Sequence, residues 1–216
     1  MHRLRPLLFS FALLLPLASY ATPITFAPTA GSVTARVSVG GTVVATGGGP
    51  LDGTFVTFDP TTGQILDFSL HSSSVFISAS ILPGAYNALM LDVTLEPGAG
   101  YSSSATGSNP YAITLGPLDV TFSGVALDVT TPITVPPQAV GGVLPISSFG
   151  VTAFYNAGQM RLGFYGVKLG EITWGSTVYD IRGDIEFIGY AVPEPALASL
   201  LAVALLGLGV AAVRRR

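Results

Sequence analysis

The sequence predicts an all-β protein with a single antiparallel domain, either a β-sandwich or a jelly-roll-like fold. Three observations lead to this prediction. Gly, Ser, Thr and Val dominate the middle of the chain, Lys and Glu are scarce there, and short apolar-polar alternations replace any long helical period. A length of 216 residues suits one well-buried domain, which we place at residues 22–191. We expect an N-terminal signal peptide and a C-terminal transmembrane helix on either side of it.

Residues 1–21 have the features of a signal peptide. Two arginines precede an apolar run at residues 7–17, which is about half of the roughly 20 residues that a membrane-spanning helix needs. Ser19 and Ala21 are the small residues that signal peptidase accepts next to its cleavage site. The sequence therefore predicts export, with cleavage after Ala21.

Thirteen short segments have the composition and alternation of strands, and clusters of Gly, Pro, Ser and Asp separate them. The predicted strands are residues 32–39, 42–46, 53–58, 64–69, 75–80, 88–95, 113–122, 126–130, 151–155, 160–167, 172–174, 176–181 and 184–188. So many short strands are typical of a sandwich or a jelly roll.

The clearest predicted hairpin joins residues 54–58 to residues 64–70. In the connection, Asp59 supplies an acceptor for turn amides and Pro60 presets its own φ. Gly63 takes the left-handed conformation that a following bulge requires. We expect this segment to serve folding alone.

A Leu-Asp-Val-Thr quartet occurs three times, at residues 91–94, 118–121 and 127–130. On a strand, alternation places Leu and Val on one face and Asp and Thr on the other. The Asp of each copy then faces solvent. The alternative is that these Asp residues are calcium ligands, but no Asp-rich loop with ligand spacing is present. We expect no metal and no cofactor. The nine-residue offset between the last two copies predicts a turn or bulge at residues 123–124.

Three segments rich in Gly or Pro predict long loops, at residues 47–50, 97–110 and 131–148. The glycine triplet at residues 47–49 is not a phosphate-binding loop, because no helix pattern and no Lys follow it.

Charge and residue types exclude several functions. Between the two ends, four basic residues stand against eleven acidic ones, a balance that disfavours nucleic-acid binding. Cysteine is absent, which removes disulfides and thiolate chemistry. His71 is the one histidine after the signal peptide, and the adjacent serines at residues 72–74 do not acquire triad geometry by adjacency. We therefore predict no enzyme.

Glycoside hydrolysis is the alternative that needs only two carboxylates. Asp184 and Glu186 share a strand face, and Glu171 and Asp180 lie nearby in sequence. Lys168 and Arg182 are close enough to pair with these carboxylates, so the simpler interpretation is a set of surface ion pairs.

Aromatic residues gather in the C-terminal half, and exposed rings of this kind stack on sugars. The neighbours Phe154 and Tyr155 point to opposite faces of a strand, as do Phe164 and Tyr165, so one member of each pair faces outward. If the domain binds exopolysaccharide, we expect the stacking residues to be Trp174 and Tyr155 or Tyr165.

Residues 192–216 combine a short motif, an apolar segment and a basic end. The apolar segment crosses a thin bilayer if helical, at about 1.5 Å per residue. The final arginines favour the cytoplasmic face, which places the domain outside. In order, the tail consists of Val192, Pro193, Glu194 and Pro195, the span 196–213, and Arg214, Arg215 and Arg216.

This tail resembles that of the PEP-CTERM family of exported proteins from Gram-negative bacteria, and the resemblance covers residues 192–216 alone. It implies that an exosortase, a membrane protease-transpeptidase, recognises Pro193, Glu194 and Pro195. It also implies association with exopolysaccharide and biofilm matrix. We expect a protein anchored in the inner membrane and then displayed at the cell surface or in the matrix, without catalytic activity; the alternative is a carbohydrate-binding module.

Overall fold

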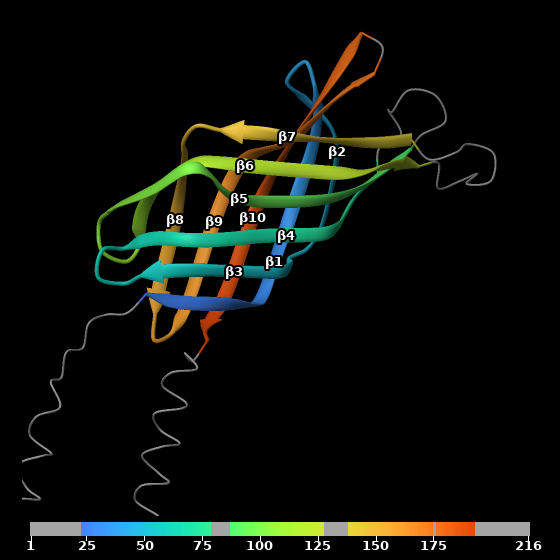
Figure 1. Cartoon of the computed structure of the whole chain (residues 1–216). Helices are drawn as coiled ribbons and strands as arrows, with labels where there is room; N and C mark the ends of the chain where they lie inside the picture. The colour runs from blue at the N-terminus through green and yellow to red at the C-terminus, as the bar shows by residue number, and fades with distance from the viewer. Residues whose placement is uncertain (1–22, 79–86, 128–137, 175, 193–216) are drawn as a thin grey trace, which may run out of the picture.

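A computed structural model describes residues 23–78, 87–127, 138–174 and 176–192 (Figure 1). This part is an antiparallel all-β domain without helices, which confirms the predicted class. Within these ranges, no helix is long and apolar enough to cross a membrane. The predicted signal peptide, with Ser19 and Ala21, and the tail from Pro193 to Arg216 lie outside the described residues.

Ten strands make up the domain. They are β1 (Ile24–Val39), β2 (Thr42–Pro50), β3 (Asp52–Asp59), β4 (Gln64–Ser78), β5 (Ala88–Thr106), β6 (Tyr111–Leu127), β7 (Gln138–Ile146), β8 (Phe149–Asn156), β9 (Gln159–Trp174) and β10 (Thr177–Ala191).

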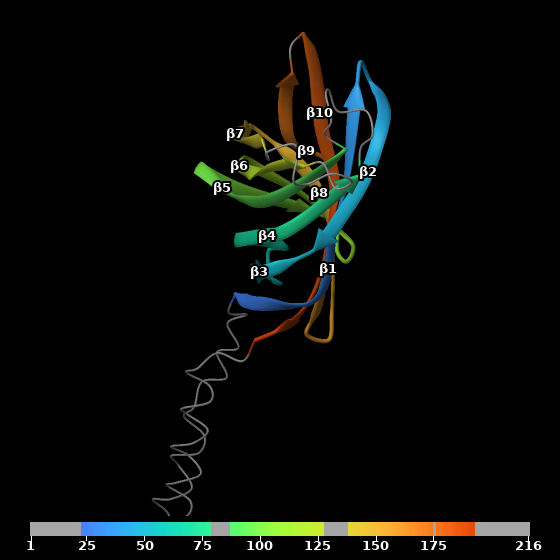
Figure 2. The same cartoon turned by 90° about the vertical axis from the view of Figure 1, so that its right-hand side faces the viewer.

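The strands belong to one sheet that bends around a single core. Its order is β10-β9-β8-β6-β5-β4-β2-β1-β3, and an additional pairing of β10 with β1 closes the ring. Figures 1 and 2 show two layers, with β3 to β6 covering β8, β9, β10 and β1 at a steep crossing angle. Strand β7 extends the first layer by pairing with the second half of β6.

The core forms because alternate residues of both layers point inward. Burial along β10 alternates almost without exception from Tyr179 to Gly189, and β9 contributes a denser buried run. The largest side chains that are fully buried include five phenylalanines from both layers: Phe26, Phe58, Phe68, Phe164 and Phe187. One apolar interior therefore holds the two layers together.

The prediction of a loop at residues 47–50 was wrong, because the glycine triplet lies within β2. Gly47 pairs with Ile77 of β4. At this pairing the sheet bends from one layer into the other. A Cβ on Gly47 or Gly49 would overlap backbone carbonyls of β4, and one on Gly48 would overlap a carbonyl of β1. These glycines are present because only they allow three strands to approach so closely at the bend.

Several other expectations about loops are corrected. Much of the segment 97–110 belongs to β5, and much of 131–148 belongs to β7. The turn or bulge expected at residues 123–124 is absent, because β6 keeps its register with β5 from Leu118 to Leu127. Because the alternation of β6 is unbroken from Leu118 to Leu127, the Leu that begins the third quartet has the opposite orientation to the Leu that begins the second. Leu118 is therefore buried, whereas Leu127 is only partly buried.

The predicted hairpin between β3 and β4 is confirmed. Asp59 accepts hydrogen bonds from the Thr61 amide at 2.8 Å and from the Thr62 hydroxyl at 2.9 Å. These bonds hold the pKa of Asp59 below its ordinary value against the opposing effect of burial. Gly63 has φ of 73°, as the turn requires.

Candidate functional site

An open groove of about 600 Å³ lies on the outer face of β8, β9 and β10. Its lining residues are Asn109, Thr152, Phe154, Asn156, Gln159, Arg161, Leu162, Gly163, Tyr165, Glu186, Phe187 and Ile188. Most come from adjacent strands of one layer, and Asn109 reaches the groove from the turn between β5 and β6.

The strand register places the lining side chains in two neighbouring rows. Phe154 of β8 lies opposite Arg161 of β9, which lies opposite Ile188 of β10. In the next row, Gly163 of β9 lies between Thr152 and Glu186. Gly163 has no side chain, whereas Thr152 and Glu186 on either side of it do. The second row is therefore recessed at Gly163, which forms the floor of the groove.

The ring of Tyr165 lies across this floor. A Cβ built on Gly163 would meet the Tyr165 ring and hydroxyl at 2.7 Å, so the ring folds back over the glycine. A bulge in β9 opposite Asp184 allows this orientation, with Gly166 at φ of 72°. The Gly166 amide donates to Asp184 at 2.8 Å, and Arg36 pairs with the same carboxylate. Asp184 therefore anchors the bulge that presents Tyr165.

Three aromatic side chains are exposed on this face. Tyr165 is 58% exposed, Phe154 is 48% exposed, and Tyr190 is 53% exposed. Tyr190 is outside the groove lining but lies opposite Gln159 in the register, next to the end of the groove that Asn156 and Gln159 line. Exposed rings beside amide and hydroxyl groups form a surface with apolar and hydrogen-bonding parts.

The structure does not bring the three predicted stacking residues together. Tyr165 lies in the groove. Tyr155 is half-buried and turned inward, where its ring contacts Phe26 and Phe58 at centroid distances of 5.9 and 5.7 Å. Its neighbour Phe154 takes the outward position. Trp174 lies at the other end of β9, and its side chain is outside the described residues.

The carboxylates considered for glycoside hydrolysis mostly have other roles. Glu171 pairs with Lys168 at 2.6 Å, Asp180 pairs with Arg182 at 2.8 Å, and Asp184 holds the bulge. Glu186 is the single carboxylate among the groove residues, without a second one at catalytic separation in the lining. This geometry offers no support for a hydrolase.

No known protein family, curated protein or solved structure matches this chain. The chemistry of the groove is therefore the basis for assigning a function to the domain.

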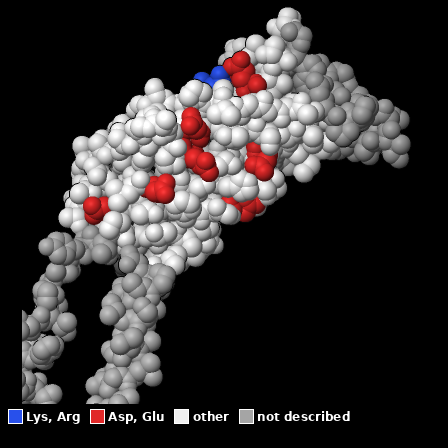
Figure 3. All heavy atoms as spheres, in the orientation of Figure 1, with Lys and Arg blue, Asp and Glu red and all other residues white. Residues whose placement is uncertain are grey.

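Acidic side chains dominate the opposite layer. Strands β3 to β6 carry no Lys or Arg, and Figure 3 shows the acidic groups spread over this face. The acidic residues of these strands are Asp52, Asp59, Asp67, Asp92, Glu96 and Asp119. Within the described ranges, no group of three or more His, Cys, Asp or Glu side chains has a metal-binding arrangement.

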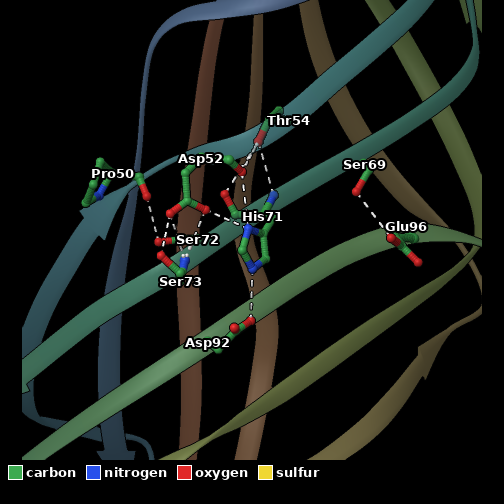
Figure 4. Close-up of polar contacts among 9 residues, drawn as sticks. All are labelled: Pro50, Asp52, Thr54, Ser69, His71, Ser72, Ser73, Asp92 and Glu96. Atoms are coloured by element: carbon green, nitrogen blue, oxygen red, sulfur yellow. Dashed lines mark hydrogen bonds and ion pairs between the residues drawn. The ribbon is translucent and has the colours of Figure 1, made fainter.

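His71 lies in a polar cluster on this acidic layer (Figure 4). Its Nδ1 is 2.6 Å from Asp52 Oδ1, and its Nε2 is 3.2 Å from Asp92 Oδ1. The Ser73 hydroxyl donates to Asp52 and, with His71 as a second cause, holds the pKa of that carboxyl below its ordinary value. A nucleophilic serine would need its hydroxyl on the histidine ring, so this cluster joins β3, β4 and β5 without triad geometry.

Proposed function

We propose that this chain is an exported cell-surface or extracellular-matrix protein whose β domain binds polysaccharide through the groove on β8 to β10. The observation that carries the proposal is the outward exposure of Phe154 and Tyr165 in one groove that Asn156 and Gln159 also line. Sugar rings have apolar C–H faces that pack on aromatic rings, and their hydroxyls pair with amides. An open groove on the outer face of a sheet accommodates a chain that continues at both ends.

Binding without catalysis is the role that this arrangement supports best. The lining offers rings, amides and one carboxylate, and the floor is preformed by Gly163 and the bulge at Gly166. Rigid strands position such a surface more accurately than loops do. The alternative is a purely structural surface domain, which would not require Phe154 and Tyr165 to be exposed in one groove.

Replacing both Phe154 and Tyr165 by Ala is expected to weaken binding about tenfold or more, because covering apolar ring surface contributes about 25 cal/mol per Å² and a loss of about 1.4 kcal/mol is a factor of ten. The measurement is calorimetric titration of the full-length chain in detergent with purified exopolysaccharide of the producing bacterium. The matched control is Phe76→Ala, which removes a ring that is 42% exposed on β4. Equal affinity of the double variant and the unaltered protein would rule out this groove.

The exported location is proposed from the two ends of the chain. Signal peptidase cleavage after Ala21 and recognition of Pro193, Glu194 and Pro195 by an exosortase would place the domain outside the cytoplasm. Arg214, Arg215 and Arg216 would remain on the cytoplasmic side of the inner membrane. The PEP-CTERM resemblance of residues 192–216 supports this route, and from there the protein would reach the cell surface or the matrix.

Replacing Pro193 and Pro195 by Ala is expected to abolish processing of the tail, because the extended Pro-Glu-Pro segment would then be able to continue the following helix. The intact mass of the protein recovered from cells reports whether residues 196–216 remain. Pro50→Ala, far from the tail in sequence, is the control and should be processed normally. If the double variant has the same mass and location as the unaltered protein, the tail is an anchor only.

A further inference from the structure

Arg161 is the one basic side chain of the described domain without a carboxylate partner. Each of the other three has such a partner: Arg36 pairs with Asp184, Lys168 with Glu171, and Arg182 with Asp180. Arg161 is exposed and lines the groove instead. Its guanidinium group carries five donors in a planar fork, and that fork matches the two oxygens of a carboxylate.

The neighbours of Arg161 leave these donors available to a ligand. In the register, Arg161 lies between Phe154 and Ile188, and neither side chain accepts a hydrogen bond. Glu186 lies on β10 two residues before Ile188, the residue opposite Arg161. It forms no ion pair with Arg161 in the described structure. The groove therefore has a cationic part beside Phe154 and an anionic part beside Gly163.

The remaining charge of the domain does not favour a general attraction to polyanions. The acidic layer of β3 to β6 repels them, and the basic side chains other than Arg161 are neutralised in ion pairs. An anionic ligand would be held only where a donor group is both free and placed beside a stacking surface. That combination occurs at Arg161 and Phe154.

We propose that the groove recognises an acidic polysaccharide, with Arg161 binding the carboxylate of a uronic acid unit. In this arrangement Phe154 and Tyr165 pack against sugar faces, and Glu186 accepts hydrogen bonds from hydroxyls of an adjoining unit. The inference deepens the proposed function and rests on it. It adds one requirement, namely that the carboxylate of the sugar, and not its ring alone, contributes to affinity.

The test compares oligogalacturonate with the same oligosaccharide after its carboxyl groups have been reduced to alcohols. The full-length chain in detergent is titrated with each at low salt. The unaltered protein should bind the acidic form about tenfold more tightly, and R161Q should lose this difference. R161K keeps the charge but not the planar fork, so its preference for the acidic form should be intermediate between that of the unaltered protein and that of R161Q. R182Q is the matched control, because it removes one positive charge from the same layer outside the groove.

The outcomes separate this inference from the proposed function. Equal binding of the acidic and reduced forms, with both weakened by Tyr165→Ala, would overturn the role of Arg161 and leave sugar binding in place. A loss in R182Q as large as that in R161Q would also overturn it, since charge in general would then be the cause. Failure to bind either form would overturn the inference and count against the groove as a sugar site. Affinity for the acidic form alone should also fall as salt is raised.

Discussion

Replacing Phe58 by Ala is expected to lower the free energy of unfolding by about 3–5 kcal/mol, the range for deleting a buried aromatic side chain. Phe58 is fully buried, and its ring contacts Tyr111 at 5.5 Å and Tyr155 at 5.7 Å. The substitution would leave a cavity beside the rings of Tyr111 in β6 and Tyr155 in β8, which the surrounding strands cannot close without losing register. Chemical denaturation followed by circular dichroism measures the change.

Phe154→Ala is the matched control for this experiment. It removes the same atoms from the outward face of β8, where the ring is about half exposed, and should cost less than about 1 kcal/mol of stability. Its expected effect is on sugar binding instead. A stability loss for Phe154→Ala as large as that for Phe58→Ala would mean that Phe154 belongs to the core, and the groove would lose one of its two stacking surfaces.

Replacing Gly47 by Ala is expected to destabilise the protein by about 3 kcal/mol, the upper end of the usual range for overpacking. The added Cβ would overlap the Phe76 carbonyl and lie 2.6 Å from the Cα of Ile77. Both obstacles are backbone, so no side-chain rotation relieves the overlap. The pairing of β2 with β4 at residues 46–48 would have to separate, and this pairing is the link between β4 and β2 in the strand order.

The control for the glycine experiment is Gly150→Ala in β8. Nothing lies within 4 Å of a Cβ at Gly150, and its φ is not in the left-handed region. Alanine there should be neutral or stabilising by up to about 1 kcal/mol, because it restricts the unfolded chain. The same denaturation measurement applies. If Gly47→Ala were as mild as Gly150→Ala, the close approach of β2 and β4 would not limit stability.

The strand content and the β3–β4 hairpin were predictable because they depend on local chemistry. Asp59, Pro60 and Gly63 specify their turn wherever it occurs, and alternation in residues 91–94 reports the buried face directly. The glycine triplet in β2 misled the prediction for a physical reason. Glycine marks both flexible loops and points of close backbone approach, and only the tertiary fold distinguishes the two.

The number and length of strands were also misjudged at bulges. Residues 64–69 and 75–80 are predicted as separate strands, yet β4 is one strand from Gln64 to Ser78, with a register shift between Ser72 and Val75. Likewise the predicted strands 160–167 and 172–174 both belong to β9, which continues through the bulge at Gly166. A bulge admits polar or glycine residues without ending the strand, so a break in alternation does not mean a break in pairing.

The groove was predictable only in part. Alternation correctly required one ring of each aromatic pair to face outward, and Tyr165 was among the predicted residues. Which of Phe154 and Tyr155 faces outward depends on what packs beneath β8, here Phe26 and Phe58. That Arg161 has no ion-pair partner among the described residues was not visible either, because the partners of a charged side chain are set by the folded sheet.

The two ends of the described domain meet at one pole, and this has a mechanical consequence. The Val192 amide donates to Thr25 at 2.8 Å, and the Ala191 amide donates to Gly158 in the turn between β8 and β9, where the groove ends. If the chain is tethered beyond Val192 and holds a polysaccharide in the groove, the load passes from β8 and β9 directly into β10. Tension on the polymer would then bypass β3 to β7, and the rest of the fold would stay unstressed.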